Sequence, residues 1–303
     1  MGNPREGDDA GTSPPVHLRL LRRCTRRMYT VRGAARVADA LRRHWVRRGG
    51  EYWIDDFDDG TRLRIDLAEH MASQIFWRGF YSGDELAVLA GRLSPDATFV
   101  DVGANMGEFT LFAARRCARI YAFEPAAGLF ERLRSNVAAN DLRHVTTVRS
   151  ALSDRVGELT LAEPRDAWTD GSRQAGLGSL FDYPDAVGVR RQTVPVTTLD
   201  AFVASEGPAR LDIIKIDVEG SELAVLRGAE AAVARFRPDL MIELSAASAA
   251  RAGHAVNDVL AWLAARRYRA FSILPGGRLV PRVTGDASGF ENALFVPEER
   301  PCP

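Results

Sequence analysis

Lysine is almost absent from this chain of 303 residues. Lys and Arg together number 40, and Lys215 is the only lysine, so the other 39 basic residues (40 minus one) are arginine. Lys215 lies in the stretch LDIIKIDVEGSE, within an apolar run that is followed by Asp217 and Glu219. The function of this segment must therefore explain why an ammonium stands where nearly every other basic position has a guanidinium.

Cysteine is scarce and long apolar runs are missing. Cys24, Cys117 and Cys302 are far apart and include no CxxC pair, which argues against a disulfide framework and against a zinc site. No apolar run approaches the roughly 18 residues of a membrane span, and the stretch MGNPREGDDAGTSPP is too polar for a signal peptide. These features predict a soluble protein of the reducing cytoplasm.

Arginine is concentrated near the N-terminus, where residues 1–50 contain 12 Arg against 4 acidic residues. Residues 1–16 are expected to form a disordered tail, because Gly, Pro, Asp and Ser dominate them. Apolar residues then recur every three or four positions from Leu21 to Trp45, which predicts one amphipathic helix or two helices broken near Gly33. The DG pair of EYWIDDFDDGTRLRIDL predicts a hairpin, and residues 67–93 are expected to be helical.

Residues 17–93 are therefore predicted to be a helical and hairpin extension of the main domain. Its basic helix is expected to pack on its own domain with a solvated arginine face. Binding to an anionic membrane or to nucleic acid is the less favoured alternative. A homodimer formed through this region is a further possibility.

Strands and helices alternate over residues 94–303. The segments TFVDVG, RIYAFEP, VTTVRSA, LDIIKIDVEG and PDLMIELS are predicted strands, and YRAFSIL and NALFVPE end the domain without a helix between them. This order predicts an α/β fold with a mostly parallel sheet and an antiparallel last strand. Residues 153–199 are too long for a simple connection and are expected to be an insertion, with GELTLAE and RQTVPVTTL as extra strands. This insertion is expected to serve as a mobile substrate cover, or else to be a passive element.

The segment FVDVGANMGEFT combines a strand, a glycine turn and a helix start, an arrangement that places a ligand at the carboxyl end of the strand. A dinucleotide site would have the pattern GxGxxG, but Asn105 occupies the middle position and Asp101 ends the strand. A carboxylate is unsuited to pyrophosphate, whereas S-adenosylmethionine carries an ammonium and a sulfonium. Gly103 and Gly107 would let the backbone approach this cofactor closely.

The next two strand ends complete the predicted cofactor site. Glu124 follows the glycine turn at about 20 residues, the placement at which an acid binds the ribose hydroxyls; a helix cap before Pro125 is the alternative. The third strand end offers a polar contact to adenine and an apolar wall. The predicted cofactor-binding residues are Asp101, Gly103, Asn105, Gly107, Glu124, Pro125, Ser150, Ala151, Leu152 and Asp217.

These segments resemble the motifs of a known family. DVGANMGEFT, YAFEP, ALSD, VPVTTLD and IKIDVEGSE are similar to successive motifs of the FkbM family of S-adenosylmethionine-dependent methyltransferases, a branch of the class I fold, over about residues 60–245. The resemblance implies a seven-stranded Rossmann-like sheet and methyl transfer, most often to an oxygen of a sugar or secondary metabolite. Many members carry an acid after an aromatic pair, where FYSGDE has Ser82, so we assign no cofactor role to Tyr81 or Glu85.

Methyl transfer from a sulfonium is an in-line displacement, so the protein must align the acceptor and remove its proton. The predicted catalytic residues, which lie in the fourth strand and at the ends of the fourth and fifth, are Lys215, Asp217, Glu219 and Glu243. We expect burial to lower the pKa of Lys215, so that it removes the acceptor's proton or holds the acceptor oxygen while Asp217 orients it. An ion-pair network that only joins the strand ends is the alternative.

Asp217 and Glu219 could also hold a divalent ion, but their spacing gives this little support and no metal site is predicted. His70 and His254 could reach the site, although structural or solvated roles are expected. The sequence therefore predicts a methyltransferase that acts on a hydroxyl of a small molecule. The alternatives are an N-methyltransferase, an RNA methyltransferase guided by the basic helix, and a scaffold that binds the cofactor without catalysis.

Overall fold

The computed structural model describes residues 12–28, 35–164, 172–173, 176–183, 188–282 and 289–302. Two compact units divide the chain, one formed by Met1–Tyr81 with Ala167–Arg173 and the other by Ser82–Asp166 with Gln174–Pro303. We expected the division after residue 93, but α4 (Gly83–Arg92) lies in the second unit because it packs against α5, β11 and β12 of that unit. Most of the expected tail lies outside the described residues.

The first unit contains three helices and a hairpin within its described residues. These elements are α1 (Val16–Met28), α2 (Ala35–Val46), β1 (Glu51–Phe57), β2 (Thr61–Asp66) and α3 (His70–Arg78). The antiparallel pairing of β1 with β2 confirms the predicted hairpin. The basic segment forms two helices, and its expected break near Gly33 falls outside the described residues. α1 packs on α3 and leaves Arg19, Arg23 and Arg27 exposed, as expected, whereas Arg22 is buried against Phe76 and paired with Asp56.

The second unit is built on an eight-stranded sheet of order β12-β11-β13-β10-β9-β3-β4-β5. The strands are β3 (Thr98–Val102), β4 (Arg119–Phe123), β5 (Val145–Val148), β9 (Ile213–Ile216), β10 (Asp239–Ser245), β11 (Tyr268–Leu274), β12 (Arg278–Pro281) and β13 (Phe290–Pro297). β5, β4, β3, β9 and β10 run parallel to one another, and β13 is antiparallel to both β10 and β11. This sheet has the mostly parallel class I methyltransferase architecture, with β12 added at one edge.

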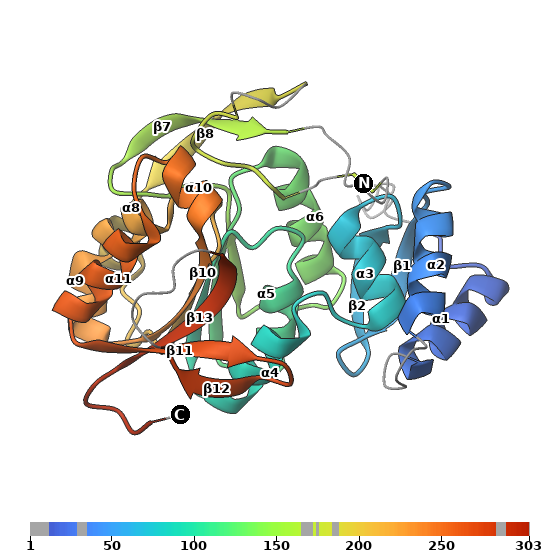
Figure 1. Ribbon diagram of the computed structural model, residues 1–303, viewed down its shortest axis with the longest axis horizontal. Helices are drawn as coiled ribbons and strands as arrows, with labels where there is room; N and C mark the ends of the chain where they lie inside the picture. The colour runs from blue at the N-terminus through green and yellow to red at the C-terminus, as the bar shows by residue number, and fades with distance from the viewer. Residues whose placement is uncertain are drawn as a thin grey trace, which may run out of the picture. The chain divides into compact units, whose positions relative to one another are not determined.

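Helices cover both faces of this sheet. Figure 1 shows α8, α9 and α11 on one side of the sheet and α5 and α6 on the other. The helices of the second unit besides α4 are α5 (Glu108–Ala113), α6 (Ala127–Ala138), α7 (Leu199–Glu206), α8 (Glu222–Arg227), α9 (Glu230–Phe236), α10 (Ala246–Arg251) and α11 (Val256–Ala265). The segment SELAVLRGAEAAVARF forms two helices instead of the expected one, and Gly228, a poor helix former, lies at the break.

The insertion forms a small sheet of its own. β6 (Ala151–Leu152), β7 (Gly157–Glu163) and β8 (Arg190–Thr197) pair in the order β6-β8-β7, which confirms the two extra strands. The predicted third strand therefore divides, because β5 belongs to the central sheet while Ala151 and Leu152 pair with β8.

The alternation of side chains along β9 divides its residues between two environments. Ile214 and Ile216 join the apolar core that packs against α8, α9 and α11, whereas Lys215 points to the opposite face, where its Nζ lies 4.7 Å from the centre of the Phe109 ring in α5. Among the helices that the structure describes, none has the length and apolar character of a membrane span.

Candidate functional site

The carboxyl ends of the four central parallel strands bring the predicted site residues to one edge of the sheet. Asp101 of β3 lies opposite Lys215 of β9 in the register, and Met241 of β10 lies opposite Lys215 on the other side. The glycine turn packs directly on this edge, because a Cβ atom at Gly103, which has a φ of +78°, would lie 1.9 Å from the Asp217 carbonyl oxygen. The site therefore requires glycine at position 103.

Lys215 is the centre of a buried polar cluster. Its Nζ donates to the Gly103 carbonyl at 3.2 Å and lies 3.2 Å from Asp217 Oδ2 and 3.7 Å from Asp101 Oδ1. Burial disfavours the ammonium, but the attraction of Asp217 and Asp101 outweighs burial and raises the pKa of Lys215 above its ordinary value. Our expectation that burial lowers this pKa was wrong, because it did not include Asp101 as a second anionic neighbour.

Asp101 is fully buried beneath the glycine turn. Its Oδ2 accepts a hydrogen bond from Thr110 Oγ1 at 2.6 Å. Its Oδ1 has no hydrogen-bond partner among the described residues. Burial raises the pKa of Asp101, against the opposing influence of Lys215 and Thr110. A cationic ligand at this turn would compensate the buried carboxylate.

Glu124, which follows β4, connects the glycine turn to the start of α6. Its Oε2 accepts from the Asn105 backbone N–H at 2.8 Å and its Oε1 from the Ala126 backbone N–H at 2.9 Å. Burial raises its pKa to about 7. The bond to Ala126 falls on the residue before α6 and not on the first turn of the helix, so the capping alternative also stays a prediction. Each carboxylate oxygen has a second acceptor site, so the ribose role stays a prediction.

The other predicted cofactor residues lie in varied environments. Ser150 Oγ donates to the Pro195 carbonyl, which fixes it to the small sheet. Leu152 belongs to the main core and Ala151 to the core of the small sheet, and Pro125 is half-buried. A Cβ atom at Gly107 would meet Leu133 at 2.8 Å. The close approaches at Gly103 and Gly107 are thus made by other parts of this chain, and the contacts of these residues with a cofactor stay predictions.

Three of the predicted catalytic acids converge beside Lys215. Each of Asp217, Glu219 and Glu243 offers one carboxylate oxygen, and these three oxygens lie within 4.8 Å of one another. Burial, followed by the charge of Asp217, raises the pKa of Glu219 to about 7 and raises the pKa of Glu243 well above its ordinary value. The arrangement can bind a cation or accept a proton.

Four polar residues that we did not predict surround Glu219. Ser248 Oγ donates to Glu219 Oε2 at 3.2 Å, and Arg251 Nη2 lies 3.9 Å from the same oxygen. Arg251 also lies over the Tyr183 ring, at 4.2 Å from its centre, and Ser179 Oγ donates to the Glu219 carbonyl at 2.7 Å. Ser248 and Arg251 follow the last motif of the family resemblance, so no sequence signal marked them.

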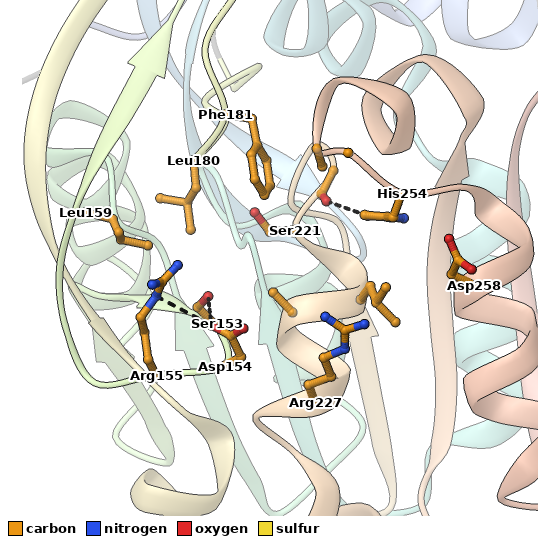
Figure 2. Close-up of a pocket in the computed structure, with 15 residues that line it drawn as sticks. Ser153, Asp154, Arg155, Leu159, Leu180, Phe181, Ser221, Arg227, His254 and Asp258 are labelled. Carbon is orange, nitrogen blue, oxygen red and sulfur yellow. Dashed lines mark hydrogen bonds and ion pairs between the residues drawn. The ribbon is translucent and has the colours of Figure 1, made fainter.

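A pocket of about 450 Å³ lies beside the turn that follows Glu219. Figure 2 shows Leu180 and Phe181 on one side of it and His254 on the other. Ser221 lines the pocket, and its buried Oγ has no hydrogen-bond partner among the described residues. His254 Nε2 is 3.1 Å from the Gly220 carbonyl oxygen, so this histidine supports the turn. The lining is mixed, with apolar side chains such as Leu159 and Leu180 beside charged ones such as Arg155 and Arg227.

Two other residues that we considered have partners elsewhere. His70 belongs to the first unit, where its ring nitrogens are 3.1 Å from Ser172 Oγ and 2.7 Å from Gln74 Nε2. Glu85 accepts a hydrogen bond from Asn292 Nδ2 at 2.8 Å.

Comparison with known proteins is consistent with this geometry. The sequence profile of the Methyltransferase FkbM domain matches residues 101–270, more than half of the chain, and includes both the glycine turn and the carboxylate cluster. The chain belongs to the FkbM methyltransferase family. The matched region extends beyond residue 245, where we expected the resemblance to end, and so includes Ser248 and Arg251.

Individual relatives cover different parts of the chain. The AMB antimetabolite synthetase AmbE of Pseudomonas aeruginosa is 30% identical in an alignment of 246 positions that covers 69% of this chain and 11% of AmbE. The 31-O-demethyl-FK506 methyltransferase FkbM of Streptomyces tacrolimicus is 32% identical in an alignment of 164 positions that covers 46% of this chain and 62% of that protein. The crystal structure of Methyltransferase FkbM from Methylobacillus flagellatus is similar to this structure with a TM-score of 0.44 and a sequence identity of 18%. The match covers 87% of this chain and 60% of that chain. This chain thus spans less than two thirds of the length of these relatives.

Proposed function

We propose that this protein transfers the methyl group of S-adenosylmethionine to a hydroxyl oxygen of a small molecule. One observation carries the proposal: the buried cluster around Lys215 joins the glycine turn to the carboxylates at the ends of β9 and β10. A cofactor bound at the turn and an acceptor bound at the carboxylates would meet at this edge of the sheet.

The first half of the site suits the cofactor. Asp101, whose Oδ1 has the Lys215 ion pair but no hydrogen-bond donor among the described residues, would interact with the positively charged end of S-adenosylmethionine, and Glu124 would accept hydrogen bonds from the ribose hydroxyls with its second acceptor sites. Lys215 is a positioning residue in this scheme, because its contacts with Gly103 and Asp217 fix the turn against the strand end.

The second half of the site suits an alcohol. In the reaction the acceptor oxygen forms a bond to the methyl carbon, the carbon–sulfur bond breaks, and its electron pair stays on sulfur to give S-adenosylhomocysteine. The hydroxyl proton must leave, and the carboxylates of Glu219 and Glu243 are placed to receive it. A neutral amine would not need this help. The name of the FkbM relative, a 31-O-demethyl-FK506 methyltransferase, also favours oxygen.

The pocket beside Ser221 is our candidate for the rest of the acceptor, because it adjoins the turn that carries Glu219. Its volume of about 450 Å³ suits part of a small metabolite. Transfer rates that fall steeply and linearly with log salt concentration would instead favour the RNA-methyltransferase alternative. A role in secondary metabolism and a cytoplasmic location are parts of the same proposal.

Separate measurements of binding and turnover test the proposal. We expect Asp101→Asn and Glu124→Gln to weaken S-adenosylhomocysteine binding by about 1.5–3 kcal/mol each in titration calorimetry, the scale of hydrogen bonds to charged groups. Glu219→Gln should keep cofactor affinity and lower the transfer of labelled methyl to a panel of hydroxylated acceptors by about 10²-fold or more.

The exposed Glu158→Gln variant is the matched control and should change neither quantity. Unchanged cofactor affinity in both Asp101→Asn and Glu124→Gln would disprove this placement of the cofactor. Methylated amines as the only products would favour the N-methyltransferase alternative, and binding without turnover on every acceptor would favour the scaffold.

A further inference from the structure

We propose that Asp217, Glu219 and Glu243 bind a divalent metal ion, which holds the acceptor oxygen. The role of the ion toward the acceptor rests on the proposed function, whereas ion binding itself does not. The inference goes beyond the sequence, because Asp217 and Glu219 alone gave little support for a metal and Glu243 comes from a different strand.

The geometry of the three carboxylates fits one ion. Their nearest oxygens lie within 4.8 Å of one another. Divalent ions bind oxygen ligands at about 2.0–2.6 Å, so two ligand oxygens on opposite sides of one ion are about 4–5 Å apart. The three side chains therefore need little movement to share an ion.

Each carboxylate keeps an oxygen for the ion. Asp217 Oδ2 faces Lys215, and Glu219 Oε2 accepts a hydrogen bond from Ser248. One oxygen of each side chain is therefore fixed by a neighbour. No described residue contacts the other oxygen, Asp217 Oδ1 or Glu219 Oε1, within hydrogen-bond distance. Glu243 is more than nine-tenths buried, and its Oε2 has no hydrogen-bond partner among the described residues. A buried carboxylate oxygen without a partner is costly, and a bound cation would remove that cost.

The balance of charge around the strand ends also favours a cation. Six carboxylates lie at or next to these ends, in the residues Asp101, Glu124, Asp217, Glu219, Glu222 and Glu243. Two cations accompany them in the described part of the chain, Lys215 and Arg251, which leaves an excess of four negative charges (six minus two) when all six are ionised. S-adenosylmethionine, with two positive groups and one carboxylate, reduces the excess to three, so a divalent ion would still be attracted.

The ligand set indicates the class of ion. Three carboxylates, without histidine or cysteine, favour a hard ion such as Mg²⁺, Mn²⁺ or Ca²⁺. Three protein oxygens leave coordination positions open, and an acceptor with two neighbouring oxygens, such as a vicinal diol or a hydroxy acid, could occupy two of them. The ion would lower the pKa of the coordinated hydroxyl. The proton would pass to water or a carboxylate, after which the oxygen attacks the methyl carbon.

Binding of Mn²⁺ alone tests the site without any assumption about the acceptor. The full chain is stripped with a chelator, saturated with S-adenosylhomocysteine and titrated with Mn²⁺, with bound ion measured by electron paramagnetic resonance. We expect one site in the wild-type protein and a loss of about tenfold or more in affinity for Glu243→Gln and for Glu219→Gln, since changes to the partners of metal ligands alone cost about 10–100-fold. Glu158→Gln, which removes the same charge from an exposed position, should bind Mn²⁺ as the wild type does.

The outcomes separate this inference from the proposed function. Absence of Mn²⁺ binding in the wild type would overturn the inference. Equal affinity in Glu243→Gln and Glu219→Gln variants that still bind S-adenosylhomocysteine would show an adventitious ion only, and would overturn it as well. Methyl transfer that persists in chelator would also overturn it while leaving the methyltransferase proposal intact. One-site Mn²⁺ binding that both variants lose, without transfer to any acceptor, would uphold the ion site and count against the proposed function.

Discussion

At the scale of single residues, Lys215 shows why a chain that favours arginine keeps one lysine. Its Nζ has three oxygen neighbours in different directions, on Gly103, Asp101 and Asp217, and an aromatic face, that of Phe109. A compact ammonium with three donors can serve such a set, whereas a planar guanidinium is larger and directs its donors in a flat fork. The residue is therefore better explained as the joint between the glycine turn and β9 than as the base.

We expect Lys215→Met to lower the free energy of unfolding by about 3–5 kcal/mol, because it leaves buried carboxylates without their cation. Lys215→Arg should lose less, about 1–3 kcal/mol, from overpacking. Denaturant unfolding of the second unit measures both, with Arg227→Met as the control, since Arg227 is exposed on α8. Wild-type stability in Lys215→Met would show that the cluster contributes nothing to the fold.

Because parallel strands end at one edge of a sheet, the sequence predicted that Asp101 and Asp217 lie close together, and the structure places both beside Lys215; their roles stay predictions. The sequence did not show in which direction the pKa of Lys215 is shifted, because this shift depends on the approach of Asp101 from an adjacent strand. Nor could it reveal Arg251, because a contact between α10 and the loop before β8 leaves no periodic pattern in the chain.

At the scale of elements, residues 176–183 of the insertion connect the small sheet to the site. Ser179 exchanges two backbone hydrogen bonds with Ala162 of β7 and donates its Oγ to the Glu219 carbonyl. Gly176 has a φ of +100°, and a Cβ atom there would lie 2.0 Å from Asn105 Nδ2, so this segment also reaches the glycine turn. Both halves of the proposed site thus contact one loop, which suits the predicted substrate cover.

Ser179→Ala should loosen this loop, because the Glu219 carbonyl and the Phe181 N–H both lose a partner. A loss of about 1 kcal/mol would raise the rate of limited proteolysis between residues 172 and 183 about fivefold and raise the KM of the acceptor. Cofactor and acceptor together should slow cleavage of the wild type. Ser205→Ala, which removes an exposed hydroxyl from α7, is the control. Equal cleavage in all these states would leave the loop a passive insertion.

At the scale of the whole molecule, the alternation of strands and helices was enough to predict a mostly parallel sheet with an antiparallel last strand, whereas the class I fold was predicted from the family resemblance. The edge strand β12 was missed because RLVP is a short segment without strong alternation. We expected the division between the units after residue 93, whereas it falls after Tyr81. α4 follows α3 after a few residues, and only the packing of α4 on α5 and β11 assigns it to the second unit. Tertiary contacts decide such boundaries.

The three cysteines offer a probe of the fold as a whole. Cys117 is buried in the second unit between α5 and β4, and burial raises its thiol pKa from 9.0 to about 12, whereas Cys24 and Cys302 are exposed. A pKa of about 12 lowers the thiolate fraction near pH 8 by about 10³-fold. We therefore expect an aromatic disulfide reagent to label two thiols quickly in the native protein and the third only as that unit opens. Rapid labelling of all three would contradict the packing at the start of β4.

The position of β13 has a consequence for how the protein is made. This strand fills the gap between β10 and β11, although both precede it in the chain. While the ribosome is still adding residues 275–289, β10 has an open edge with no partner on that side. Such edges pair readily with other chains, so the nascent protein passes through an interval in which the later half of its sheet is open to aggregation, and that interval ends only when β13 has emerged.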